Sequence, residues 1–262
     1  MYIGQVRASF NRFERLCARL CTIEELDGEI GVFKTYYFIE WAHPGGAQPA
    51  LAAQSADPFV LSGAQIVKLL APLDLNSVGC VLSRTIEARE PDSIPDYAGV
   101  LELWFERADL ASASVRLSGP IAACLAPGFR IGPVVTGLVK TVMRTSAFYQ
   151  QPCVKGVFPF RRKPGMSLDA FQHHWWHTHG PIAAGTPEAL NYYQCHPFLS
   201  DYEAGAPPYD GVTELYWADM DRARAAMSSS HMTVNQANDA KNFADGESIA
   251  LFFATEEIIV AP

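Results

Sequence analysis

The sequence lacks the features of several large protein classes. It has no run of about 18 apolar residues, so we expect no transmembrane helix. Arginines interrupt the beginning of the chain, which therefore lacks the apolar segment of a signal peptide. The net charge is −8 and no basic block occurs, which argues against nucleic acids and membranes as partners. These absences favour a cytoplasmic enzyme or binding protein.

Common chemical motifs are also missing. No CxxC pair, glycine-rich phosphate loop, nucleophile motif or pair of catalytic carboxylates stands out. Apolar residues make up 49% of the 262 residues, which is enough for one large core or two small ones. The cysteines are scattered, and we predict that they are reduced thiols. They are Cys17, Cys21, Cys80, Cys124, Cys153 and Cys195.

What the chain does have is an internal repeat. "YAGVLELWFERADLA" at 97–111 resembles "YDGVTELYWADMDRA" at 209–223. Each copy alternates in polarity as a strand does, then continues through a polar turn into a helical stretch. Glu102 and Glu214 occupy equivalent positions in the two copies, and we expect a structural role for both. The repeat predicts two related domains.

The second half can be divided into elements. We expect strands at about 154–162, 190–196, 211–217 and 248–260, a helix capped by Ser167 that ends near Gly180-Pro181, and a helix from about Asp219 followed by a polar connector. This β-α-β-β-α-β order is the ferredoxin-like unit. The first half fits the same order less cleanly, with a helix at 62–73 and a loop at 42–58.

These elements predict an α+β fold. One face of a ferredoxin-like sheet is left without helices and must pack on something. We therefore predict two tandem ferredoxin-like (βαββαβ) units packed sheet to sheet as an intramolecular α+β barrel. The domains are expected at 1–150, as a degenerate scaffold, and at 151–262.

The helix of the second half carries an unusual cluster. "FQHHWWHTHGPIAAG" at 171–185 holds four of the seven histidines. His174 and His179 should border the buried face from opposite sides, whereas His173 and His177 should point away from it. At 100° per residue, the buried face itself consists of Leu168, Phe171, Trp175 and Thr178.

The two histidine pairs have different interpretations. His173 and His177 have the i, i+4 spacing of a metal pair, but neither an HExxH glutamate nor a third ligand accompanies them. We therefore expect a solvated pair and no metal site. His174 and His179 are either satisfied core histidines or functional groups, and the residues alone leave this open.

The motifs of this half resemble the EthD family of dimeric α+β-barrel proteins. The similarity lies in Lys163-Pro164-Gly165 after Arg162, in Phe171, in His174-Trp175, in His179-Gly180-Pro181 and in the Tyr192/Gln194/His196 strand. It covers about 150–260, and the first half shares it only through the repeat. Since the first half has no histidine helix, the resemblance implies one active site per chain, in the second half.

The resemblance also implies a range of chemistry. Proteins of this superfamily include isomerases of muconolactones and dienoates that need no cofactor, and others that bind haem. Our hypothesis is a cofactor-free isomerase acting on a small, carboxylated, conjugated product of aromatic catabolism. The alternatives are a non-catalytic EthD-type accessory protein and a haem-binding or oxygenase member, and an assembly of several such barrels stays open.

Roles can be assigned within this hypothesis. His179 is the first candidate for the acid–base group, supported by His174 and His196. Tyr192 would donate to a developing enolate and Gln194 would help to hold it. If the other face of this strand meets the helices, Tyr193 replaces Tyr192. A substrate carboxylate would bind Arg161 or Arg162, with Trp175 as a stacking wall.

Overall fold

The computed structural model describes residues 32–42, 57–59, 65, 66, 68, 79–88 and 95–260. Cys17, Cys21, most of the loop expected at 42–58 and most of the helix expected at 62–73 lie outside these residues. The cysteines that are described are free thiols, as predicted. Among the described helices, none combines the length and the apolar character needed to cross a membrane.

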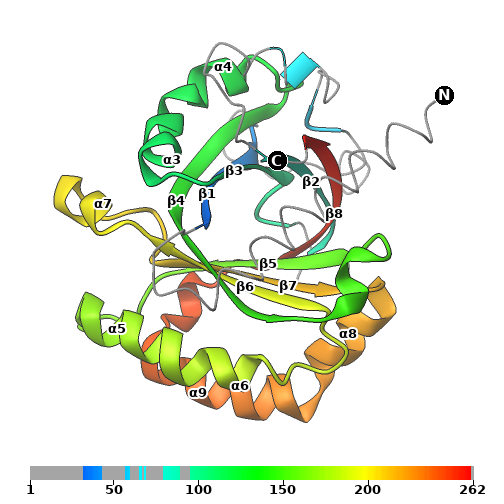
Figure 1. Cartoon of the computed structure of the whole chain (residues 1–262), viewed down its shortest axis with the longest axis vertical. Helices are drawn as coiled ribbons and strands as arrows, with labels where there is room; N and C mark the ends of the chain where they lie inside the picture. Colours follow the sequence, from blue (N-terminus) through cyan, green and yellow to red (C-terminus); the bar gives the residue numbers. More distant parts are fainter. Residues whose placement is uncertain are drawn as a thin grey trace. The chain divides into compact units, whose positions relative to one another are not determined.

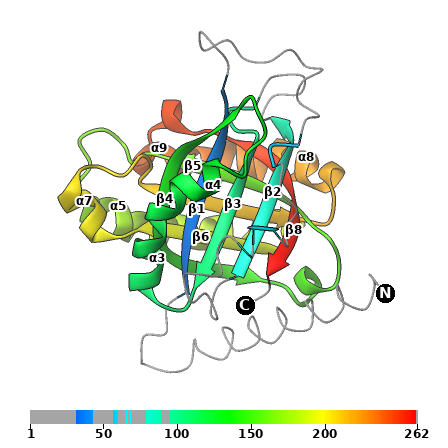
Figure 2. The ribbon, with the colours of Figure 1, turned by 90° about the horizontal axis from the view of Figure 1, so that it is seen from above.

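The chain forms two compact units. The strands of the first are β1 (Val32–Trp41), β2 (Gly79–Ala88), β3 (Gly99–Phe105) and the beginning of β4 (Phe129–Arg144). β3 pairs antiparallel with both β1 and β2, and Figure 2 shows it between them. After β3 come α3 (Ala108–Ser114), the short 3₁₀ helix η5 (Val115–Leu117) and α4 (Ser118–Ala122).

The second unit holds the histidine-rich segment. Its strands are β5 (Val154–Phe160), β6 (Asn191–Pro197), β7 (Gly211–Trp217), the first part of β8 (Phe252–Val260) and the end of β4. The first crossover contains α5 (Leu168–His174), the π turn η7 (Trp175–His179) and α6 (Gly180–Ala183). The second contains α8 (Met220–Ser228), the π turn η8 (His231–Gln236) and α9 (Ala237–Phe243). Short 3₁₀ helices, η6 (Ser146–Tyr149) and η9 (Gly246–Ser248), precede β5 and β8, and α7 (Leu199–Ala204) follows β6.

The strand order confirms the predicted fold class. The hydrogen-bonded strand orders β8-β5-β7-β6 and β4-β1-β3-β2 have the same connectivity, which is that of a ferredoxin-like unit. The described part of the chain is therefore an α+β fold in which this strand connectivity occurs twice. The repeat seen in the sequence corresponds to β3 and β7, which are equally long.

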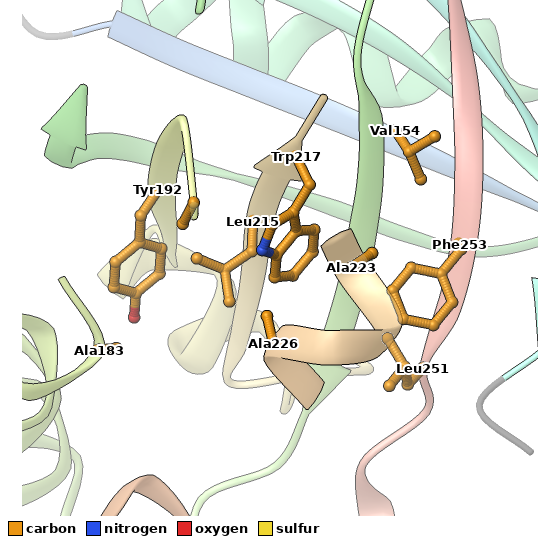
Figure 3. Packing of buried hydrophobic residues seen from close by; sticks show 10 residues of the cluster. Val154, Ala183, Tyr192, Leu215, Trp217, Ala223, Ala226, Leu251 and Phe253 are labelled. Carbon is orange, nitrogen blue, oxygen red and sulfur yellow. The ribbon is translucent and has the colours of Figure 1, made fainter. Parts of the chain in front are cut away.

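The core of the second unit lies between its sheet and its helices. In Figure 1 the helices α5, α6, α8 and α9 cover one face of the sheet that contains β5, β6 and β7. Tyr192, Leu215 and Trp217 project from that face toward Ala183 of α6 and Ala226 of α8 (Figure 3). Burying large aromatic rings in this layer stabilises the unit.

Two expectations about the helices are wrong. The first crossover does not end near Gly180-Pro181 but continues to Ala183, because Pro181 falls in the first turn of α6, where its missing N–H costs nothing. The expected polar connector after the second helix is itself helical, through η8 and α9. The second difference brings Asp239 and Phe243 of α9 to the histidines.

Candidate functional site

The helix of the site begins at a well-defined cap. Ser167 Oγ accepts a hydrogen bond from the Ala170 N–H, as the sequence predicts, and Asp169 lies in the first turn. Phe171 and Trp175 then face the sheet. They pack in one cluster with Phe160 of β5 and Phe243 of α9. Their rings contact one another at centroid distances between 5.0 and 6.1 Å. This aromatic cluster anchors α5.

A π turn changes the direction of the side chains after Trp175. In a regular α-helix, residues five apart point about 140° away from each other. In the π turn Trp175–His179 the backbone hydrogen bonds join residues that are five apart in the chain. His174 and His179 therefore lie on the same side of the helix. Thr178, which we expected on the buried face, is exposed, while His179 is buried. The expectation of opposite sides for the two histidines is therefore wrong.

Both histidines meet one carboxylate, which the sequence did not indicate. Asp239 of α9 lies 3.0 Å from His174 Nε2 through Oδ1 and 2.8 Å from His179 Nδ1 through Oδ2. The Phe243 ring, one turn further along α9, packs against both imidazoles, with centroid distances of 5.3 and 4.6 Å. The π turn and α9 together thus build a His–Asp–His group at the border of the core.

The shared carboxylate decides which ring nitrogens carry hydrogen. An ionised carboxylate can only accept hydrogen bonds, so His174 Nε2 and His179 Nδ1 must be the donors. The opposite nitrogens, His174 Nδ1 and His179 Nε2, then hold lone pairs when the rings are neutral. Neither has a hydrogen-bond partner within the described part of the chain. The arrangement offers two proton acceptors of fixed tautomer.

The electrostatics favour a neutral His179. Burial lowers its pKa below the ordinary value of 6.5, and the hydrogen bond to Asp239 offsets this only in part. For Asp239, burial acts to raise the pKa, but the hydrogen bonds and charges of the two histidines outweigh it, and the pKa is lowered. A neutral imidazole beside an ionised carboxylate is the state in which a histidine acts as a base.

The strand residues of the predicted site form a separate group. Tyr192 packs against α6, so the face of β6 that carries Tyr192, Gln194 and His196 is the one that meets the helices. Gln194 Nε2 donates to the Trp175 carbonyl oxygen at 3.0 Å and to the Tyr192 hydroxyl oxygen at 2.9 Å. His196 Nδ1 is hydrogen-bonded to Gln172 Oε1. These contacts connect β6 to the helix, but no hydrogen bond joins them to Asp239.

Deep burial constrains these groups. Tyr192 is completely buried, and burial raises its pKa to about 12. His196 lies against the rings of Trp175 and Trp176, and burial together with the charge of Lys140 lowers its pKa to about 3. Both side chains are therefore uncharged over the ordinary pH range. Trp175 is also fully buried, so its ring is part of the core rather than an exposed wall.

The two arginines differ in their surroundings. Arg162 Nη1 lies 2.5 Å from Asp210 Oδ1, and its backbone N–H donates to the other carboxylate oxygen. Asp210 also accepts from the Tyr202 hydroxyl, and Arg162 Nε donates to the Met166 carbonyl oxygen in the turn before α5. Arg161 is exposed at the end of β5. The next residue, Lys163, donates to the Lys241 carbonyl oxygen and holds the last turn of α9.

The outer histidines are where the sequence predicts them. His173 and His177 are exposed, more so than His174 and His179, and their rings are 4.8 Å apart. Among the described residues, no group of three histidine, cysteine or acidic side chains could hold a metal ion.

Comparison with known proteins finds a family match over this region. Residues 163–247, less than half of the chain, match the model of the EthD domain. The matched range includes the KPG turn, the histidine helix, the β6 strand and Asp239. No curated protein matches the chain.

Solved structures extend the similarity to the rest of the fold. A mutant chlorite dismutase from Candidatus Nitrospira defluvii is 13% identical, with 88% of this chain and 94% of that chain covered and a TM-score of 0.51. An EthD family protein from Bacillus halodurans is 23% identical over 38% of this chain and 95% of that chain, with a TM-score of 0.33. The first likeness shows that the fold extends beyond the EthD domain.

The sheet face opposite the helices carries the repeated glutamates. In the second unit, Lys155 Nζ lies 3.0 Å from both Glu214 and Glu256, and the Tyr216 hydroxyl donates to Glu256. In the first unit, Lys34 Nζ lies 2.6 Å from Glu102. The lysines, Glu102 and Glu214 are fully buried. Buried charges persist only when they are paired, which accounts for the recurrence of the glutamates in both halves.

Proposed function

We propose that the protein is a cofactor-independent isomerase, which moves a proton within a small conjugated carboxylate from aromatic catabolism. The observation that carries the proposal is the shared carboxylate Asp239, which fixes the tautomers of His174 and His179. A carboxylate behind an imidazole orients the ring and stabilises the imidazolium that forms when the ring takes a proton.

The proposed reaction uses His179 as the base. Its Nε2 lone pair takes a proton from an acidic carbon of the substrate, and the electron pair left behind delocalises into the conjugated system as an enolate. The His179 imidazolium, held by Asp239, then returns the proton at another carbon of the same system. No net oxidation occurs, and the enzyme ends in its starting protonation state.

The other predicted residues take revised roles in this proposal. The Tyr192 hydroxyl is fully buried and already accepts a hydrogen bond from Gln194, so we assign it to the support of the helix and not to an enolate. His196 stays neutral and buried, and we assign it to the same support. Arg161 is the arginine proposed to bind the substrate carboxylate, because Arg162 is already paired with Asp210.

A matched set of variants tests the proposal. Muconolactones, dienoates and enolisable acids would be screened by ultraviolet absorbance with the wild type, His179→Gln and His177→Gln. The control residue His177 lies on the same helix turn but is exposed. We expect turnover that falls about 10²-fold or more in His179→Gln and is unchanged in His177→Gln. Equal rates in all three proteins would remove His179 from the mechanism.

A second candidate function, a haem-binding oxygenase, uses the same histidine. Ligating histidines usually donate their second ring nitrogen to a carboxylate, as His179 does to Asp239. His179 Nε2 would be the ligand to the iron, and the haem would supply oxygen chemistry. Titration with hemin tests this candidate, since binding through His179 gives a Soret band that His179→Gln shifts or abolishes. A protein that binds dienoates without turnover or haem would instead be an accessory protein of EthD type.

A further inference from the structure

The π turn Trp175–His179 has a contact that regular helices do not make. The Trp175 carbonyl oxygen accepts the Gly180 N–H, five residues along the chain, as a π turn requires. It also accepts a second hydrogen bond, from Gln194 Nε2 at 3.0 Å. A side chain on the neighbouring strand therefore binds the carbonyl at which the turn departs from α-helical geometry.

The donor is held firmly in place. Gln194 is completely buried in the middle of β6, opposite Thr213 of β7. The second contact of its Nε2 is with the Tyr192 hydroxyl oxygen, at 2.9 Å. A Cβ atom added at Gly180 would lie only 3.4 Å from Gln194 Nε2, so the amide rests directly against the end of the turn. Sheet and turn are thus joined by an oriented amide rather than by apolar packing alone.

The position of this contact matters for the histidines. If the turn relaxed to a regular α-helix, His174 and His179 would point about 140° apart and could not both reach one carboxylate. π turns are rare and occur frequently at functional sites, so a hydrogen bond from outside the helix to such a turn is a candidate for holding its geometry. Among the described residues, Gln194 provides the side-chain hydrogen bond to the Trp175 carbonyl.

We propose that Gln194 is a positioning residue: its amide holds the π turn and so keeps His174 and His179 on the same carboxylate, Asp239. The catalytic meaning of this role rests on the proposed function, whereas the geometric role does not. Gln194 touches neither histidine ring and is distinct from the groups proposed to move the proton.

The test measures the histidine rings rather than turnover. Nitrogen-15 NMR of the imidazoles would be recorded for proteins with and without Asp239→Asn, once in the wild type and once in Gln194→Met. In the wild type, Asp239→Asn should change the tautomer signals of both His174 and His179. In Gln194→Met we expect only one of the two histidines to respond. A response of both histidines in Gln194→Met would overturn the proposal.

Controls separate positioning from a general loss of stability. Gln236→Met removes another buried amide hydrogen bond, from Gln236 Nε2 in η8 to Thr186 Oγ1 in the loop after α6, and should leave both histidines responsive. If Gln194→Met does not fold, Tyr192→Phe removes only the phenol oxygen that Gln194 contacts. It should make hydrogen exchange of the Gly180 N–H about tenfold faster, the equivalent of one weakened hydrogen bond, and unchanged exchange would overturn the proposal. If the rings behave as expected but no substrate is turned over, the proposed function fails and the positioning role stands.

Discussion

The pH dependence of stability should reveal the buried His196. Its pKa is about 3 in the folded protein, because burial and the charge of Lys140 disfavour the imidazolium, whereas an unfolded chain has the ordinary value of 6.5. Between these values the unfolded state binds more protons than the folded state. The contribution of His196 to the free energy of unfolding is therefore complete above about pH 6.5 and is lost as the pH falls toward 3.

The size of the effect follows from the same pKa. One pH unit in this window corresponds to about 1.4 kcal/mol, so the step from pH 7 to pH 5 should lower the free energy of unfolding by about 2 kcal/mol through His196 alone. Urea unfolding, followed by tryptophan fluorescence at pH 7, 6 and 5, measures it. His196→Phe keeps a ring between Trp175 and Trp176 but cannot be protonated.

We expect the wild type to lose about 2 kcal/mol more than His196→Phe over this range. The difference between the two proteins isolates His196, because other titrating groups, His179 included, are common to both. His173→Gln removes an exposed ring from α5. Its free energy of unfolding should fall by as much as that of the wild type over this pH range. Equal losses in the wild type and in His196→Phe would refute the reasoning.

Three further predictions concern other parts of the second unit. Asp239→Asn can accept from only one histidine, so kcat of the proposed isomerisation should fall by about 10²- to 10⁴-fold with a smaller change in KM, as steady-state kinetics would show. Gly211→Ala puts a Cβ 2.6 Å from the Trp175 ring and should lower stability by about 1–3 kcal/mol, while Gly246→Ala, with open space around it, should not; equal melting temperatures would contradict this. Lys155→Met leaves buried carboxylates without their cation and should cost about 3–5 kcal/mol in urea unfolding, part of which Glu214→Gln should restore in the same chain.

The sequence predicts the sheet better than the helices. β7 begins and ends where the repeat places it, because the Gly211–Trp217 segment has both strand propensity and turn residues at its ends. The start of α5 follows from its Ser167 cap. The sequence could not predict which face of β6 meets the helices. Tyr192 and Tyr193 are both buried, and a strand that is covered on both faces shows no alternation of polar and apolar residues.

Asp239 was missed for two physical reasons. The segment around it is polar, and its buried residues, Gln236 and Phe243, are too few to produce a clear helical pattern. The second reason is the π turn, because a projection at a constant 100° per residue fails once one turn is wider. A weak signal did exist, in the good helix former Ala at 237 and 240.

The buried lysine–glutamate pair that occurs in each half is relevant to the origin of the repeat by duplication. An ancestral domain that is copied within one gene gives two halves with the same folding requirements and one surplus set of functional groups. A histidine at the edge of the core can be lost from one copy by a single substitution. Losing one member of a buried pair costs more, because Lys34 and Glu102 lie 2.6 Å apart and each would lose its opposite charge in the interior. We therefore expect such pairs to be kept in both copies after a duplication, whereas the residues around the histidines can change in one copy.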